Sequence, residues 1–185
     1  MISITCAEVC DAGRWSPHGH SLERVISSEP DAPLGALLDD ARTALSGVPQ
    51  EALGREKTGR WRAPRIVRVG SAWHVGVLLI AGDAVYATAE VLRAAAPVRR
   101  GYAAESARAR AERRAEASRG GFDDGETVHV GWTPIDLDAV AAGGSSGPLA
   151  LVDGVPSVRW SAAGSLMPLS AYLDDRIALL RSASL

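Results

Sequence analysis

Three side chains of the types that perform acid–base chemistry are expected on one face of a sheet. Tyr86 and Glu90 lie in one β-prone run, and His129 lies in another. A carboxylate beside an imidazole fixes the tautomer of the ring and raises its basicity, which is the minimum requirement for general acid–base catalysis. Glu90 and His129 are therefore the candidate catalytic pair, with Tyr86 beside them. The alternative is a set of ordinary solvent-facing side chains, or a buried structural histidine at position 129.

A second group of chemically capable residues lies near the start of the chain. Cys6 and Cys10 are four residues apart, and His18 and His20 follow. Thiolates and imidazoles are zinc ligands, so this spacing is compatible with a four-ligand site. The glycines and the proline between them favour a loop, however, and no second motif supports a zinc knuckle. We therefore expect no metal site and no cofactor here.

Common motifs give no further candidate. The sequence has no phosphate-binding loop ending in Gly-Lys-Ser/Thr, no His-Glu-x2-His and no Gly-x-Gly-x2-Gly. The acidic pair Asp123 and Asp124 precedes Gly125, but the remaining ligands of a calcium loop are missing. This short segment is expected to form a turn.

Two stretches, Val69–Leu79 and Arg119–Trp132, carry a resemblance to known proteins. In them the chain resembles short proteins of unknown function from high-GC bacteria that are labelled glutaminase, over about residues 33–183. The resemblance implies an amidohydrolase. Serine-type glutaminases look like β-lactamase-related enzymes with Ser-x2-Lys, whereas Gly54 and Arg55 precede the single lysine, Lys57. The amidotransferase type needs a cysteine in a glycine-rich elbow, which neither cysteine has, so no catalytic residue is carried over.

The elements that must position the polar face lie between Arg65 and Trp132. Two β-prone runs, 72–81 and 84–92, are joined by Gly-Asp and predict a hairpin with Leu79 opposite Tyr86 and Trp73 opposite Leu92. A helix over 102–118 follows. Its alanine stripe is expected to cover the face of the hairpin opposite the polar one, and the members of the stripe are Ala104, Ala107, Ala111 and Ala115. A strand over 126–132 brings His129 to the polar face.

Further elements are expected on both sides of this region. They are a helix over 33–46, a polar connector over 51–63 whose Trp61 packs back on the sheet, a short helix capped by Thr133, a hairpin over 149–160 that turns at Asp153–Gly154, and a helix over 168–181. Pro156 cannot donate to a strand ladder, so its strand is expected at a sheet edge. Together these elements predict an α+β domain over 33–185, with a mainly antiparallel sheet of five or six strands and helices on one face. Residues 1–32 are expected to be a weakly structured extension.

Composition bounds the function without determining it. The net charge is −2, so we expect no general attraction to nucleic acid or to anionic membranes, although Trp61 among arginines keeps a nucleic-acid site as an alternative. No run approaches 18 apolar residues, and the N-terminus lacks the basic start of a signal peptide, which together predict a cytoplasmic protein.

The hairpin face that carries Tyr86 and Glu90 also has apolar residues, which the helix would leave uncovered. These residues are Trp73, Val75, Val77 and Leu79. Because such a face needs cover, the favoured prediction is a soluble module that forms a homo-oligomer or binds a partner. The alternative is a small hydrolase that uses Glu90 and His129, and the sequence names no small-molecule ligand for it.

Overall fold

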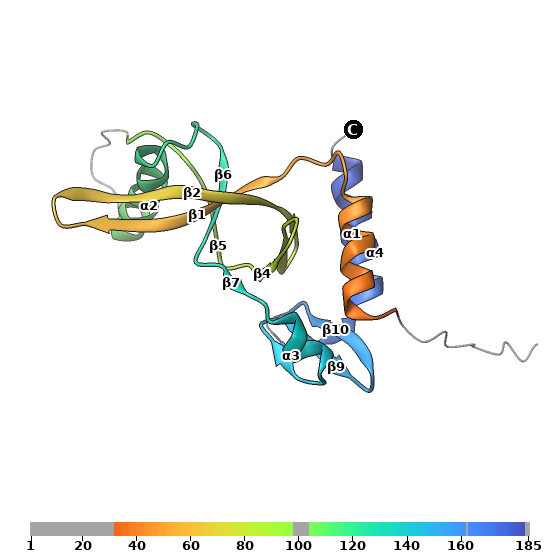
Figure 1. The fold of residues 1–185 in the computed structure, drawn as a ribbon. Coiled ribbons are helices and arrows are strands. Elements are labelled where there is room, and N and C mark those ends of the chain that lie inside the picture. The colour runs from red at the N-terminus through yellow and green to blue at the C-terminus, as the bar shows by residue number, and fades with distance from the viewer. Residues whose placement is uncertain (1–31, 98–103, 162, 184–185) are drawn as a thin grey trace, which may run out of the picture.

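The computed structural model describes residues 32–97, 104–161 and 163–183 (Figure 1). This part of the chain contains the helices α1 (Leu34–Ala44), α2 (Glu105–Arg119), α3 (Leu137–Ala141) and α4 (Leu169–Ala183). Its strands are β1 (Glu51–Gly59), β2 (Arg62–Val75), β3 (Leu78–Ile80), β4 (Val85–Ala87), β5 (Glu90–Arg93), β6 (Thr127–Val130), β7 (Thr133–Pro134), β8 (Ser145–Ser146), β9 (Leu149–Val152), β10 (Val155–Arg159) and β11 (Leu166–Pro168). The α+β class with a mostly antiparallel sheet is confirmed. The predicted N-terminal extension lies outside the described residues.

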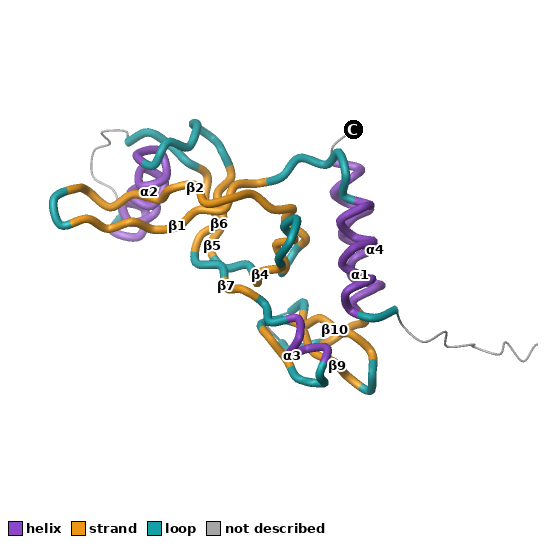
Figure 2. The backbone as a smooth tube through the Cα atoms, viewed as in Figure 1, coloured by secondary structure: helices purple, strands orange, loops and turns teal. Residues whose placement is uncertain are grey.

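The larger sheet has seven strands in the order β5-β6-β1-β2-β3-β4-β7, and only β1 and β6 pair in parallel. Two residues, Thr88 and Ala89, connect β4 to β5, and they bridge at most about 11 Å. In a flat sheet of this order β4 and β5 would be about 24 Å apart. The sheet therefore curls until its two edges approach each other, as Figure 2 shows. Its inner face carries Leu53, Ala72, Leu79 and Ala81, with Tyr86 and Trp132 packed against them.

Helices cover the outer side of the curled sheet at two places. Ala117 of α2 packs with Ile66, Leu92 and Val128 on one part of it. Helices α1 and α4 pack with β2, β3 and β4 and with the smaller sheet, whose order is β11-β10-β9-β8. The helix predicted over 168–181 is present as α4, and its buried side comprises Leu169, Tyr172, Leu173 and Ile177.

The first predicted hairpin is correct near its turn and wrong farther away. Leu79 pairs with Tyr86 as expected, and the Ala81 amide donates to the Ala84 carbonyl. Trp73, however, pairs with Ile80 rather than with Leu92. The cause is a tight turn at Gly76, whose φ of +63° is a conformation that glycine adopts without steric cost. The expected single strand is therefore divided into β2 and β3.

Residues 51–63 are not a connector, which corrects another expectation. They form β1 and the start of a long hairpin with β2, and Trp61 at its turn is 92% exposed instead of packing on the sheet. The strand was not predicted because the outer half of the hairpin is rich in charged residues. Glu, Lys and Arg have low β-propensity, and no alternation of apolar residues marks this segment as a strand.

The face that was expected to need a partner is covered by the chain itself. Val75 and Leu79 are both fully buried, Val75 beneath α1 and α4 and Leu79 on the inner face of the curled sheet. The turn at Gly76 places these two residues on different sides of the sheet. The prediction of self-association rested on an uncovered apolar face, and these buried residues no longer support it.

Smaller corrections concern α2, α3 and β10. The buried alanines of α2 are Ala115 and Ala117, because only its C-terminal half packs closely on the sheet. The side chain of Asp136, not that of Thr133, caps α3 by accepting from the Ala139 amide. Strand β10 is internal, yet it contains Pro156, because β11 pairs only with Ser157–Arg159 and leaves the proline outside that ladder.

Candidate metal centre

Two histidines and a glutamate from three adjacent strands converge on the inner face of the large sheet. Oε2 of Glu51 lies 2.5 Å from Nε2 of His129 and 3.5 Å from Nδ1 of His74. The two imidazole rings are 4.6 Å apart and inclined by 64°. One ligand atom from each side chain lies within 4.8 Å of the other two.

Strand pairing explains why these side chains meet. Glu51 and Leu53 are two apart on β1 and so share the inner face. Leu53 pairs with His129 in the parallel ladder, while Glu51 pairs with Ala72 on β2, two residues before His74. The central position of β1 between β6 and β2 therefore puts its carboxylate between the two imidazoles.

The cluster is closed on one side and open on the other. His129 is fully buried, whereas the side chains of His74 and Glu51 are 32% and 35% exposed. Nδ1 of His129 is buried and has no hydrogen-bond partner among the described residues. An ion or small molecule bound between the three side chains would therefore reach solvent past His74 and Glu51.

A backbone contact orients His74. Its Nε2 lies 2.9 Å from the Gly76 carbonyl, which can only accept a hydrogen bond. We therefore assign the proton of the neutral ring to Nε2, and the lone pair to Nδ1, which faces Glu51. A second hydrogen bond of this kind is the usual way in which proteins orient a metal-binding histidine.

The surroundings also set the protonation of the cluster. The pKa of Glu51 is lowered, chiefly by its hydrogen bond with His129 and further by nearby positive charge, against an opposing effect of burial. The pKa of His74 is lowered as well, first by burial and then by the charge of His129, while Glu51 acts in the opposite direction. At neutral pH the ionised Glu51 carboxylate thus faces a neutral His74 imidazole, and these are the forms in which the two groups bind a metal ion.

Of the three residues proposed from sequence, the structure brings only His129 into this cluster. Glu90 pairs with Val130 and so lies on the opposite face, where its carboxylate is 2.7 Å from the Arg113 guanidinium. The ring of Tyr86 packs against Trp132 at 4.6 Å. Neither side chain is a partner of His129.

Glu51 and His74 have no local sequence signal that marks them as site residues. Glu51 was assigned to a connector, so no face could be given to it. In the single strand expected over 72–81, His74 alternates with Trp73 and Val75, so it would lie on the helix-covered face, opposite the face expected to carry His129. The separations of 23 residues between Glu51 and His74 and 55 between His74 and His129 match no short metal motif, so strand pairing is the signal that would have found them. Cys6, Cys10, His18 and His20 lie outside the described residues.

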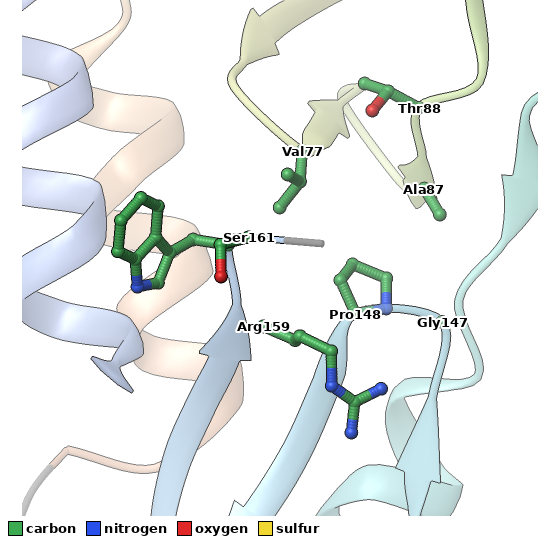
Figure 3. Close-up of a pocket in the computed structure, with 8 residues that line it drawn as sticks. Val77, Ala87, Thr88, Gly147, Pro148, Arg159 and Ser161 are labelled. Carbon is green, nitrogen blue, oxygen red and sulfur yellow. The ribbon is translucent and has the colours of Figure 1, made fainter. Parts of the chain in front are cut away.

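A shallow pocket of about 350 Å³ lies elsewhere, between the turn at Val77 and the smaller sheet (Figure 3). Its lining includes Thr88, Pro148, Arg159 and Ser161. No carboxylate or imidazole lines it, so it lacks the acidic and basic groups that Glu51, His74 and His129 bring together. Ser145 lies in a Gly-x-Ser-x-Gly sequence nearby, but it belongs to β8 after α3 rather than to the strand-to-helix turn that activates such a serine.

Comparison with known proteins adds no constraint on the site. No family model matches the chain, and no curated protein or solved structure matches it significantly. The glutaminase resemblance thus stays a prediction. No helix in the described residues is long and apolar enough to cross a membrane.

Proposed function

We propose that the chain binds a divalent transition-metal ion through Glu51, His74 and His129. The observation that carries the proposal is the convergence of two imidazoles and one carboxylate, with their ligand atoms within 4.8 Å of one another. Imidazole suits zinc, copper, iron and nickel, and two histidines with one carboxylate form a recurrent ligand set for zinc and for non-haem iron.

The distances are close to what coordination needs. Zinc binds nitrogen and oxygen at about 2.0–2.2 Å, so neighbouring ligand atoms of a tetrahedral site are about 3.4 Å apart. Nδ1 of His74 and Oε2 of Glu51 are 3.5 Å apart. The 2.5 Å contact between Glu51 and His129 would have to widen by about 1 Å, through rotation of the partly exposed glutamate side chain.

If Glu51, His74 and His129 held a metal ion, three protein ligands would leave a coordination position for water. A metal ion in such a site lowers the pKa of its bound water and generates hydroxide near neutral pH. The arrangement therefore favours a metal-assisted hydrolase over an acid–base pair of Glu90 and His129. In this proposed metal-dependent hydrolase, Glu51 takes the place of Glu90 as the carboxylate partner of His129, and Tyr86 has no role.

Metal titration of the chelator-treated full chain tests the proposal. All proteins would carry Cys6→Ser and Cys10→Ser, so that these thiols do not contribute, and zinc binding would be measured by calorimetry. Glu51→Gln and His74→Ala should each weaken zinc binding at least about tenfold, because each removes a ligand. Glu90→Gln is the matched control and should leave the affinity unchanged. Equal affinities in all four proteins would refute the site.

A further inference from the structure

The outer half of the β1–β2 hairpin extends beyond the rest of the sheet (Figure 1). Strand β6 pairs only with Ala52 and Leu53 of β1, so the residues from Gly54 to Arg68 pair only with each other. Trp61 at the turn is 92% exposed, the largest exposure of any large apolar side chain in the described residues. An indole in this position contributes nothing to the core.

Unpaired positive charge surrounds this tryptophan. The cations Lys57, Arg60, Arg62 and Arg65 lie on the two strands and the turn, and none of them forms an ion pair with a described residue. Lys57 is directly opposite Arg65 in the ladder. Like charges in such a cross-strand pair are destabilising. The hairpin therefore carries a concentration of charge that does not serve its own stability.

Positive side chains of both strands lie on one face of the outer hairpin. Glu56 alternates to the face that α2 covers, where its carboxylate is 2.7 Å from the Arg113 guanidinium. The opposite face of the outer hairpin carries Arg55, Lys57 and Arg65. The guanidinium of Arg55 lies 5.7 Å from the centre of the Trp132 ring, so this cationic face has one indole at its base and another at its tip.

We infer that this cationic face and Trp61 bind single-stranded nucleic acid. Phosphates match a row of arginine and lysine side chains, and unpaired bases stack on exposed aromatic rings. In a duplex the bases are stacked on one another, which leaves an exposed indole with no partner. The net charge of −2 gave no reason to expect nucleic-acid binding, but the hairpin separates local positive charge from the rest of the chain.

The inference is tested with the full chain and a fluorescein-labelled oligothymidylate, read by fluorescence anisotropy in the presence of a chelator. Trp61→Ala should weaken binding about fivefold or more, because it removes one stacking partner. Lys57→Ala with Arg65→Ala should weaken binding and reduce the slope of log K against log salt by about 1.4, since each phosphate contact contributes about 0.7. Arg110→Ala, an exposed cation on α2, should change neither quantity.

Three results would overturn the inference. One is an affinity for the oligonucleotide that neither hairpin variant lowers. Another is heparin binding as tight as oligonucleotide binding, with neither affinity lowered by Trp61→Ala. Heparin has charge but no bases, so this result would show that the face binds negative charge alone. The last is binding to phosphatidylserine vesicles without binding to the oligonucleotide. Because Trp61 is exposed, its replacement should leave the fold intact. The chelator keeps the result independent of metal binding at Glu51, His74 and His129.

Discussion

At the residue scale, one carboxylate organises the candidate site. Glu51 lies between a fully buried imidazole and a partly exposed one, and its negative charge faces both. Without a metal ion, the hydrogen bond from His129 is its main stabilising contact. The same three groups therefore have two uses, a hydrogen-bonded cluster when free and a ligand set when a metal ion is bound.

Titration of the metal-free chain is the first prediction. The pKa of His74 is lowered from 6.5, so the unfolded state binds this proton first, and stability should fall as the pH drops below about 6.5. The pKa of Glu51 is lowered from 4.5, so its stabilising contribution is present above that pH and is lost below it. Denaturant unfolding in chelator at a series of pH values measures both steps.

A variant separates His74 from the other groups in this titration. His74→Gln keeps a donor for the Gly76 carbonyl but has no proton to gain. The loss of stability between pH 7.5 and 5.5 should be smaller in this variant than in the parent chain. An identical loss in both proteins would show that burial of His74 does not cause it.

At the element scale, some elements follow from local sequence and others depend on pairing. Helices α1, α2 and α4 were predictable because their apolar periodicity or helix-forming composition is continuous. The turns between β3 and β4 and between β9 and β10 were predictable from Gly-Asp and Asp-Gly. Strand β1 was not, because its charged outer half is held by β2 rather than by its own propensity.

The candidate site was predictable only in part for the same reason. His129 was identified because its strand alternates clearly. Its partners could be known only from the register of β1 against β2 and β6, and the parallel pairing of β1 with β6 has no local sequence signal. The turn at Gly76 had the largest effect. Because this turn was not predicted, His74 was assigned to the wrong face of the sheet and was not recognised as a neighbour of His129.

The contact between α2 and β2 gives a prediction at this scale. A Cβ at Gly120 would lie 1.4 Å from the Ile66 carbonyl oxygen, so Gly120→Ala must push the end of α2 away from the sheet. We expect a loss of about 2 kcal/mol or more in the free energy of unfolding. Gly35→Ala, within α1 and with no atom near the added methyl group, should instead stabilise by about 0.5–1 kcal/mol. Equal effects in denaturant unfolding would contradict the contact.

At the scale of the whole molecule, the two ends of the described chain close one core. Helices α1 and α4 pack together with the large sheet and with the smaller one. Tyr172 of α4 connects these helices to the turn at Gly76 by two hydrogen bonds. Its hydroxyl accepts from the Val77 amide at 2.8 Å and donates to the Val75 carbonyl at 3.1 Å. That turn also carries the carbonyl that orients His74.

Removal of this hydroxyl should therefore be costly. Tyr172→Phe leaves the Val77 amide without its partner, and we expect a loss of about 1–3 kcal/mol in the free energy of unfolding. Tyr86→Phe is the matched control, because the Tyr86 hydroxyl has no hydrogen bond within the described part of the chain, and it should cost less than about 0.5 kcal/mol. Thermal or denaturant unfolding compares the two, and equal losses would argue against the Tyr172 contacts.

The most direct test of the central claim is an anomalous-scattering measurement on crystals grown with zinc. We predict a peak on the inner face of the large sheet, about 2.0–2.2 Å from Nδ1 of His74, Nε2 of His129 and a carboxylate oxygen of Glu51. The opposite result would be a map with no peak among these three side chains, or with zinc bound only elsewhere. It would show that Glu51, His74 and His129 form a hydrogen-bonded structural cluster and not a metal centre.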